Sequence, residues 1–160
     1  IPKNFIPFVD KGIQDTMTSG IYSGYPVVDI KARLLDGSFH DTDSTDMAYR
    51  IAASMAFKEA CREAAPLILE PIMNCEIVTP DDYMGDIIGD LNARRGKILS
   101  MTPRGNVQAI KAMVPLSGMF GYSTELRSKS QGRASYTMQP SHYEDVPPNI
   151  AQKVVSRSGF

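Results

Sequence analysis

The sequence is poor in several features that would point to a particular class of protein. Its two cysteines, Cys61 and Cys75, have no CxxC spacing, so we expect two inert thiols in a reducing compartment and no disulfide framework. No apolar run approaches the roughly 18 residues of a membrane span, and there is no signal-peptide pattern. The formal net charge of -1 gives no global sign of nucleic-acid binding, so such binding would have to depend on local basic patches.

What is present is typical of a soluble globular protein. The chain has 160 residues, of which 42% are hydrophobic and 22% charged, enough for one ordinary domain or two small ones. It opens on "IPKNFIPFVDKG" without an initiator methionine, so we expect a fragment or a processed product.

The first 65 residues predict two helices with a strand between them. Apolar residues recur at helical spacing from Ile6 to Met17, and "SGIYSGYP" then breaks that pattern. Residues 28–34 alternate between apolar and polar, which predicts a half-buried strand. A second helix is expected to begin after Ser44 or Thr45 as its N-cap. We expect its small and apolar face to lie in the core: Ala48, Ile51, Ala52, Met55, Ala56 and Ala60.

The pattern changes between Pro66 and Pro71, and we place a domain boundary after residue 70. Beyond it the elements follow the order β-α-β-β-α-β, which is the split βαβ of a ferredoxin-like domain with both helices on one face of a four-stranded antiparallel sheet. The segments are "PIMNCEIVTP", "DDYMGDIIGDLNARR", "GKILSMTP", "NVQAIKAMVP", "LSGMFGYSTELRSKSQG" and "RASYTMQPSHY", followed by a short helix "PPNIAQKVVSR". The predicted fold class of the chain is therefore α+β.

The loop "LLDGSFHDTDSTDM" contains His40, one of only two histidines, among four aspartates. A calcium loop of the EF-hand type would need Gly and Glu where Asp46 and Ala52 stand. A zinc site needs several His or Cys ligands, and the other histidine, His142, falls in the other predicted domain. No nucleophile motif accompanies His40 either. A polar connector with a Ser44 cap explains the hydroxyls of the loop but leaves His40 and its neighbour Phe39 without a role.

The segment "GDLNARRGKI" fails as a phosphate-binding P-loop, because six residues separate Gly89 from Gly96 and Ile98 follows the lysine. The second of these glycines is instead expected to end a helix. No nucleotide site is therefore expected in this chain.

Basic residues gather in the second half of the chain. Between residues 94 and 133 eight of them face a single acid, Glu125. Such a run is compatible with an ordinary solvated surface, but it also suits guanidinium groups that are presented to phosphates of RNA. Both interpretations stay open on composition alone.

Three long motifs carry a resemblance to a known family. They are "GYPVVDIKARLLDGSFHDTDSTDMAYRIAASMAFKEA", "GDLNARRG" and "GYSTELRSKSQGR". Together with "TPRGNVQAIKAMVPLSG" and "HYEDVP", they resemble the C-terminal third of bacterial-type translation elongation factor G, in order and over essentially the whole chain.

The resemblance implies two domains. Residues 1–70 would form most of domain IV, an incomplete ribosomal-protein-S5-like βαβ domain with a left-handed crossover, which lacks its first strands and a "GGRGQFG"-type tip loop. Residues 71–160 would form the ferredoxin-like domain V. The matching tip residues, expected to contact RNA, are Ser38, Phe39, His40, Asp41, Thr42 and Asp43. The matching domain V residues are Arg94, Arg95, Arg104, Arg127, Lys129 and Arg133.

The resemblance also implies function and partners. The parent would be a GTPase that promotes translocation of tRNA and mRNA, with GTP and Mg bound in a G domain that is absent here, so this fragment is not expected to be an enzyme or to hold a cofactor. The implied partners are the ribosome, through ribosomal RNA, the A-site tRNA and mRNA, and the N-terminal domains of the same factor, but no membrane. The expected location is the cytoplasm or the mitochondrial matrix. Two alternatives are a stand-alone RNA-binding module and a small metal-dependent enzyme at the His40 loop.

Overall fold

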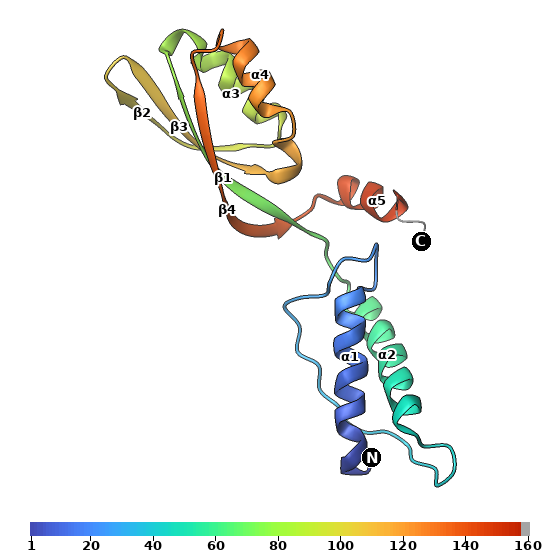
Figure 1. Cartoon of the computed structure of the whole chain (residues 1–160). Helices are drawn as coiled ribbons and strands as arrows, with labels where there is room; N and C mark the ends of the chain where they lie inside the picture. Colours follow the sequence, from blue (N-terminus) through green and yellow to red (C-terminus); the bar gives the residue numbers. More distant parts are fainter. Residues whose placement is uncertain (158–160) are drawn as a thin grey trace. The chain divides into compact units, whose positions relative to one another are not determined.

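The computed structural model describes residues 1–157 and divides into two compact units (Figure 1). The first unit comprises Ile1–Leu67 and the stretch from Pro147 onward, and the second unit comprises Ile68–Val146. The division therefore falls three residues before the predicted boundary at residue 70, and it groups the last helix, α5 (Pro148–Arg157), with the first unit.

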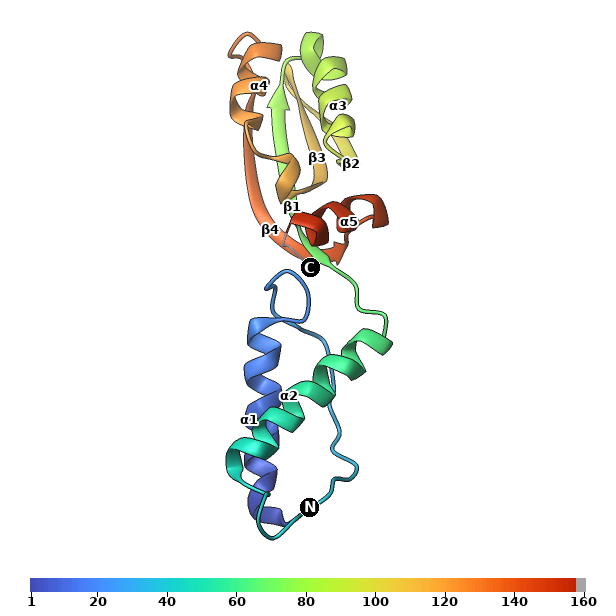
Figure 2. The same cartoon turned by 90° about the vertical axis from the view of Figure 1, so that its right-hand side faces the viewer.

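The first unit is built on two long helices, α1 (Ile6–Ser19) and α2 (Asp46–Glu63), which lie side by side in both views (Figures 1 and 2). A short 3-10 turn (Lys3–Phe5) precedes α1. Val9 of α1 packs with Tyr49 and Ala53 of α2 to form a small buried cluster. The helices can approach closely because Gly12 has no side chain, and a Cβ there would collide with the Arg50 carbonyl oxygen. Both helices predicted for this half are confirmed.

The strand predicted for residues 28–34 is wrong. Within the described part of the first unit there is no strand, and the whole connection from residue 20 to residue 45 is irregular. Val28, Ile30 and Leu34, which were expected to alternate into a core, are 55%, 41% and 43% exposed. The alternating pattern is present, but a strand needs a neighbouring strand to satisfy its backbone, and these residues have none.

The face of α2 that is buried is also not the predicted one. Tyr49, Ala53, Phe57 and Cys61 are buried, at the same i, i+4 spacing, and the first two of these pack toward α1. The predicted core face is exposed throughout: Ala48, Ile51, Ala52, Met55, Ala56 and Ala60. We call this set the exposed α2 face. The helical period predicted that one face of α2 would pack, but it did not specify the partner. The face that contains Tyr49 and Ala53 is buried because it packs against α1.

The second unit has the predicted split βαβ order. Its elements are β1 (Leu69–Thr79), α3 (Met84–Ala93), β2 (Lys97–Arg104), β3 (Val107–Pro115), α4 (Tyr122–Lys129) and β4 (Ser135–Asp145). The four strands form one antiparallel sheet in the order β2-β3-β1-β4, in which Cys75 of β1 lies opposite Ala112 of β3 and Met138 of β4. Both helices lie on the same side of this sheet (Figure 1). The α+β class is confirmed.

The core of the second unit lies between that sheet face and the two helices. Ile77 and Ile110 of the sheet pack against Leu91 of α3 and Tyr122 of α4, and none of the four is more than 1% exposed. Gly96 ends α3 as predicted: its N–H donates to the Leu91 carbonyl at 2.7 Å. This turn brings the arginines at the end of α3 next to the start of β2.

No helix among the described residues is both long and apolar enough to cross a membrane.

Candidate nucleic-acid interface

The predicted tip, residues 38–43, lies in the loop that leads into α2. A tight turn runs from His40 to Ser44 and is closed by two hydrogen bonds. The Ser44 hydroxyl oxygen accepts from the His40 N–H at 2.9 Å, and the Ser44 N–H donates to the His40 carbonyl at 3.1 Å. Ser44 is therefore not the helix cap that the polar-connector interpretation required. Thr45 is the cap, since its hydroxyl accepts from the Ala48 N–H at 3.1 Å.

An aromatic cluster beneath the tip holds the loop in place. The Tyr49 hydroxyl donates to the Ser38 carbonyl at 2.9 Å. Phe5 stacks on Tyr49 with ring centroids 4.5 Å apart, and the ring centroid of Phe39 lies 6.0 Å from that of Phe5. Ser38 and Phe39 thus contact this cluster, and all six predicted tip residues, from Ser38 to Asp43, are exposed.

The exposed tip presents hydrogen-bond donor and acceptor groups. Within residues 1–157, the His40 ring has no hydrogen-bond or ion-pair partner, and no three His, Cys, Asp or Glu side chains lie close enough to hold a metal. The second histidine, His142, lies in β4 and bonds to Ser141 and Glu144. An imidazole presented in this way can donate to, or accept from, a polar group of another molecule.

Arg94, the first of the six basic residues predicted in the second unit, makes several contacts inside that unit. Its guanidinium donates to Asp90 at 2.9 Å and to the Gly118 carbonyl at 2.6 Å, with a longer bond to the Phe120 carbonyl at 3.3 Å. It also lies 5.1 Å from the centre of the Tyr122 ring, a cation–π distance. Only 18% of the side chain is exposed. Its hydrogen-bonding capacity is therefore largely used inside the unit.

Three more of the six form ion pairs with carboxylates. Arg95 bonds to Glu70 through two nitrogens, and Arg104 bonds to Glu76 through two bonds of 2.9 and 3.2 Å. The Arg104 hydrogen bond holds the pKa of Glu76 below its usual range, which keeps that carboxylate charged. Lys129 lies 3.3 Å from Glu125, one turn earlier on α4.

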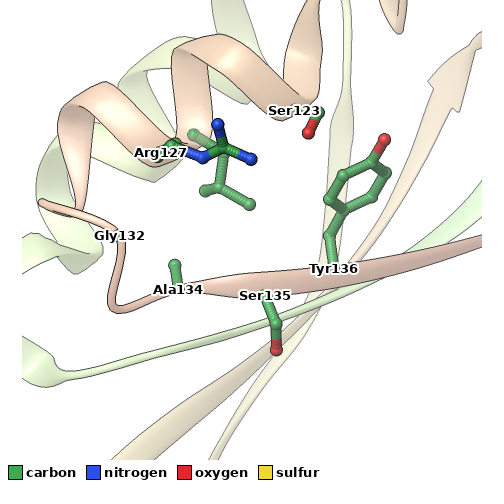
Figure 3. A pocket seen from close by; sticks show the side chains of 7 residues that line it. Ser123, Arg127, Gly132, Ala134, Ser135 and Tyr136 are labelled. Carbon is green, nitrogen blue, oxygen red and sulfur yellow. The ribbon is translucent and has the colours of Figure 1, made fainter.

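The remaining two, Arg127 and Arg133, make no hydrogen bond or ion pair through their side chains with any described residue. Arg127 lines a recess of about 260 Å³ between α4 and the start of β4, together with Ser123, Leu126, Gly132, Ala134, Ser135 and Tyr136. In Figure 3, the Ser123 hydroxyl is directed into the space between it and the Arg127 guanidinium, whereas the Tyr136 hydroxyl points away from that guanidinium and the Ser135 hydroxyl points to the other side of the strand. The structure thus groups one predicted residue with two others.

Sequence reasoning missed Ser123 and Tyr136. Part of the signal was available, since Ser123 and Arg127 stand four residues apart and must share one face of a helix. Tyr136 could not be placed in the same way, because its position depends on how β4 pairs with β1, where it stands opposite Ile77.

Comparisons with known proteins agree with this geometry and with the sequence motifs. The family model "Elongation factor G, domain IV" matches residues 1–65, and the model "Elongation factor G C-terminus" matches residues 67–154. A crystal structure of a protein from Thermus thermophilus is similar, with a TM-score of 0.83 and 39% sequence identity. The match covers 99% of this chain and 24% of that one, so the chain spans about a quarter of the length of that relative.

The two family models match consecutive stretches that together leave out only residue 66 and the last few residues. Their division also falls next to the division between the two compact units at Leu67 and Ile68. The chain therefore belongs to the elongation factor G family.

Proposed function

We propose that this chain is the ribosome-contacting part of a translational GTPase that promotes the movement of tRNA and mRNA during elongation. GTP and Mg would bind in a separate G domain of the parent, and hydrolysis there would drive the rearrangement. The chain itself would act as an arm, with the first unit entering the decoding site and the second unit contacting large-subunit RNA. Such a role belongs in the cytoplasm or the mitochondrial matrix.

The observation that best supports this proposal is the way His40 is presented. The turn closed by Ser44 and the Tyr49 hydrogen bond to Ser38 hold the backbone on both sides of His40, while its ring stays exposed. Because the backbone of the loop is already ordered, binding of a partner by the His40 ring costs little additional conformational entropy of the loop. Imidazole N–H groups can donate to phosphate oxygens or to ribose 2′-hydroxyls, so RNA is the partner that this tip suits.

The tip aspartates have a different role in this proposal. Asp41 and Asp43 form no hydrogen bond or ion pair with the residues that the structure describes, so they do not order the loop through their side chains. Their negative charge repels phosphates. We therefore assign them to specificity: they weaken nonspecific attraction to RNA, so that contact through His40 depends on correct placement by the rest of the factor.

The test is single-turnover translocation by the full-length factor with His40→Ala. We expect translocation to slow by about tenfold, the cost of one or two hydrogen bonds to a charged partner, while GTP hydrolysis stays normal. The matched control is His142→Ala, which removes the other exposed histidine from the second unit. Wild-type translocation speed in His40→Ala would refute the assignment of the tip.

A stand-alone RNA-binding role is the second candidate, and the unpaired Arg127 and Arg133 favour it. The isolated chain would then bind RNA with a steep salt dependence and without any need for a ribosome. Binding that requires an assembled ribosome supports the first proposal over this one.

A further inference from the structure

The ends of β1 and β4 form a two-stranded ribbon, residues 68–71 and 143–146, through which the chain passes between its two units. β3 pairs with β1 only from Ile72 onward, so the first residues of β1 pair with β4 alone (Figure 1). The Val146 N–H extends the ribbon by donating to the Ile68 carbonyl at 2.8 Å. On each strand the next residue already belongs to the first unit. Both connections between the units therefore leave from one end of this ribbon.

Two glutamates stand directly opposite each other in the ribbon. Glu70 of β1 and Glu144 of β4 are register partners, so their side chains lie on the same face. Like charges at directly opposite positions destabilise a pair of strands. A two-stranded ribbon is at most marginally stable by itself, because no third strand adds to its pairing. The ribbon should therefore separate unless at least one of these charges is paired.

Arg95 forms that pair. It bonds to Glu70 through two nitrogens, one of them at 3.1 Å. The Glu70 side chain is only 11% exposed and that of Arg95 34%, so water screens this pair less than it screens a pair on the open surface. Glu144 bonds instead to the ring of His142, at 2.6 Å. Among the residues that the structure describes, Arg95 is thus the one arginine or lysine that is bonded to either glutamate.

The backbone of Arg95 also indicates a role for its side chain. Its φ is 64°, a left-handed conformation just after α3, where glycine or asparagine is usual. Such a conformation is unfavourable for a residue with a Cβ and persists where the surrounding structure requires it. The contact that requires an arginine at this position is the one with Glu70, 25 residues earlier in the chain.

We propose that Arg95 holds the ribbon closed by pairing with Glu70 opposite Glu144, and that the closed ribbon couples the motions of the two units. An open ribbon would add unpaired residues to both connections at once, so each unit would gain freedom relative to the other. In this role Arg95 is a positioning residue, and the role does not depend on which molecule contacts the tip of the first unit.

The first experiment measures amide hydrogen exchange in the 160-residue chain. Arg95→Gln leaves two glutamates facing each other without a guanidinium, so exchange of the Val146 N–H should become about tenfold faster. Adding Glu144→Gln to that chain removes the repulsion and should return exchange to within about threefold of wild type. The matched control Arg104→Gln breaks an equivalent pair with Glu76, on the same strand, and should leave Val146 unchanged.

Two results would overturn the pairing role. One is faster exchange at Val146 that Glu144→Gln does not relieve, since the cause would then be something other than repulsion. The other is equally faster exchange at Ile110 in the core, since the whole unit would then be opening. Arg95→Asn separates the side chain from the backbone, because asparagine adopts the left-handed conformation more readily. It should open the ribbon as Arg95→Gln does, and a ribbon that stays closed would mean that the guanidinium does not hold it.

The second experiment tests the coupling. Arg95→Glu places a third carboxylate beside the two glutamates, so the Val146 N–H should lose its protection. Nitrogen-15 NMR relaxation gives the rotational correlation time of each unit, and both times should fall when the ribbon is open. Adding Glu70→Arg to Arg95→Glu exchanges the two charges and should restore the wild-type values. Wild-type correlation times in Arg95→Glu, with Val146 unprotected, would refute the coupling.

Discussion

Arg94 provides the sharpest test of the distinction between structural and RNA-binding arginines. The variant Arg94→Met keeps a long unbranched side chain over the Tyr122 ring and removes the guanidinium. The change leaves the Asp90 carboxylate without its ion-pair partner and two carbonyls, those of Gly118 and Phe120, without a donor. Because these contacts join α3 to the segment that leads into α4, their loss should destabilise the second unit.

The structure also indicates how large the loss should be. Removing one partner of a buried ion pair costs about 3–5 kcal/mol. The side chains of Arg94 and Asp90 keep 18% and 13% of their surface exposed, so water partly solvates the carboxylate that remains. We therefore expect a loss near the lower end, about 3 kcal/mol in the free energy of unfolding. Since about 1.4 kcal/mol corresponds to tenfold in an equilibrium constant, the open form should become on the order of 100-fold more populated.

The two cysteines make this measurable in the intact chain. Cys75 is fully buried in the second unit, and burial raises the pKa of its thiol, so it reacts with a thiol reagent only when that unit opens. Cys61 belongs to the first unit and serves as an internal control. Arg94→Met should accelerate labelling of Cys75 about 100-fold and leave Cys61 unchanged. The matched variant Arg127→Met should affect neither. If both variants change Cys75 labelling equally, the structural role of Arg94 is refuted.

Two further predictions concern the first unit. Hydrogen bonds from Arg50 hold the pKa of Asp15 below its usual range. The pKa of Asp15 is lower in the folded state than its unfolded value of about 3.9, so the pair stabilises the unit fully above that pH. This stabilisation is lost as the pH falls through the folded-state pKa. The midpoint of thermal unfolding of wild type should therefore lose its advantage over that of Arg50→Gln below about pH 4. On the exposed α2 face, Ile51→Lys with Met55→Lys should reduce binding of a hydrophobic dye and leave thermal unfolding nearly unchanged, whereas Ala53→Lys on the buried face should unfold the unit. Unfolding by the double variant would mean that this face is covered in solution.

The second unit could be predicted from the sequence almost completely, because all the partners that its patterns require are inside the chain. The alternation in β1 is satisfied by β3 on one side and β4 on the other, and the apolar stripes of α3 and α4 meet the buried face of that sheet. In the first unit the same reasoning failed for residues 28–34 and for the exposed α2 face. A periodic pattern predicts that a face packs against something, but it does not specify the partner, and here α1 was the partner available.

The candidate interface shows a second limit of the same kind. In the sequence, Arg94, Arg104 and Arg127 are equivalent basic residues in one stretch. Their environments differ because Arg104 meets Glu76, 28 residues earlier, while Arg94 turns inward to carbonyls 24 and 26 residues later. Two i, i+4 pairs were visible from local spacing, Asp90 with Arg94 and Glu125 with Lys129. Long-range pairing therefore decides which positive charges remain for a ligand, and it leaves Arg127 without a side-chain partner among the described residues at the edge of the recess.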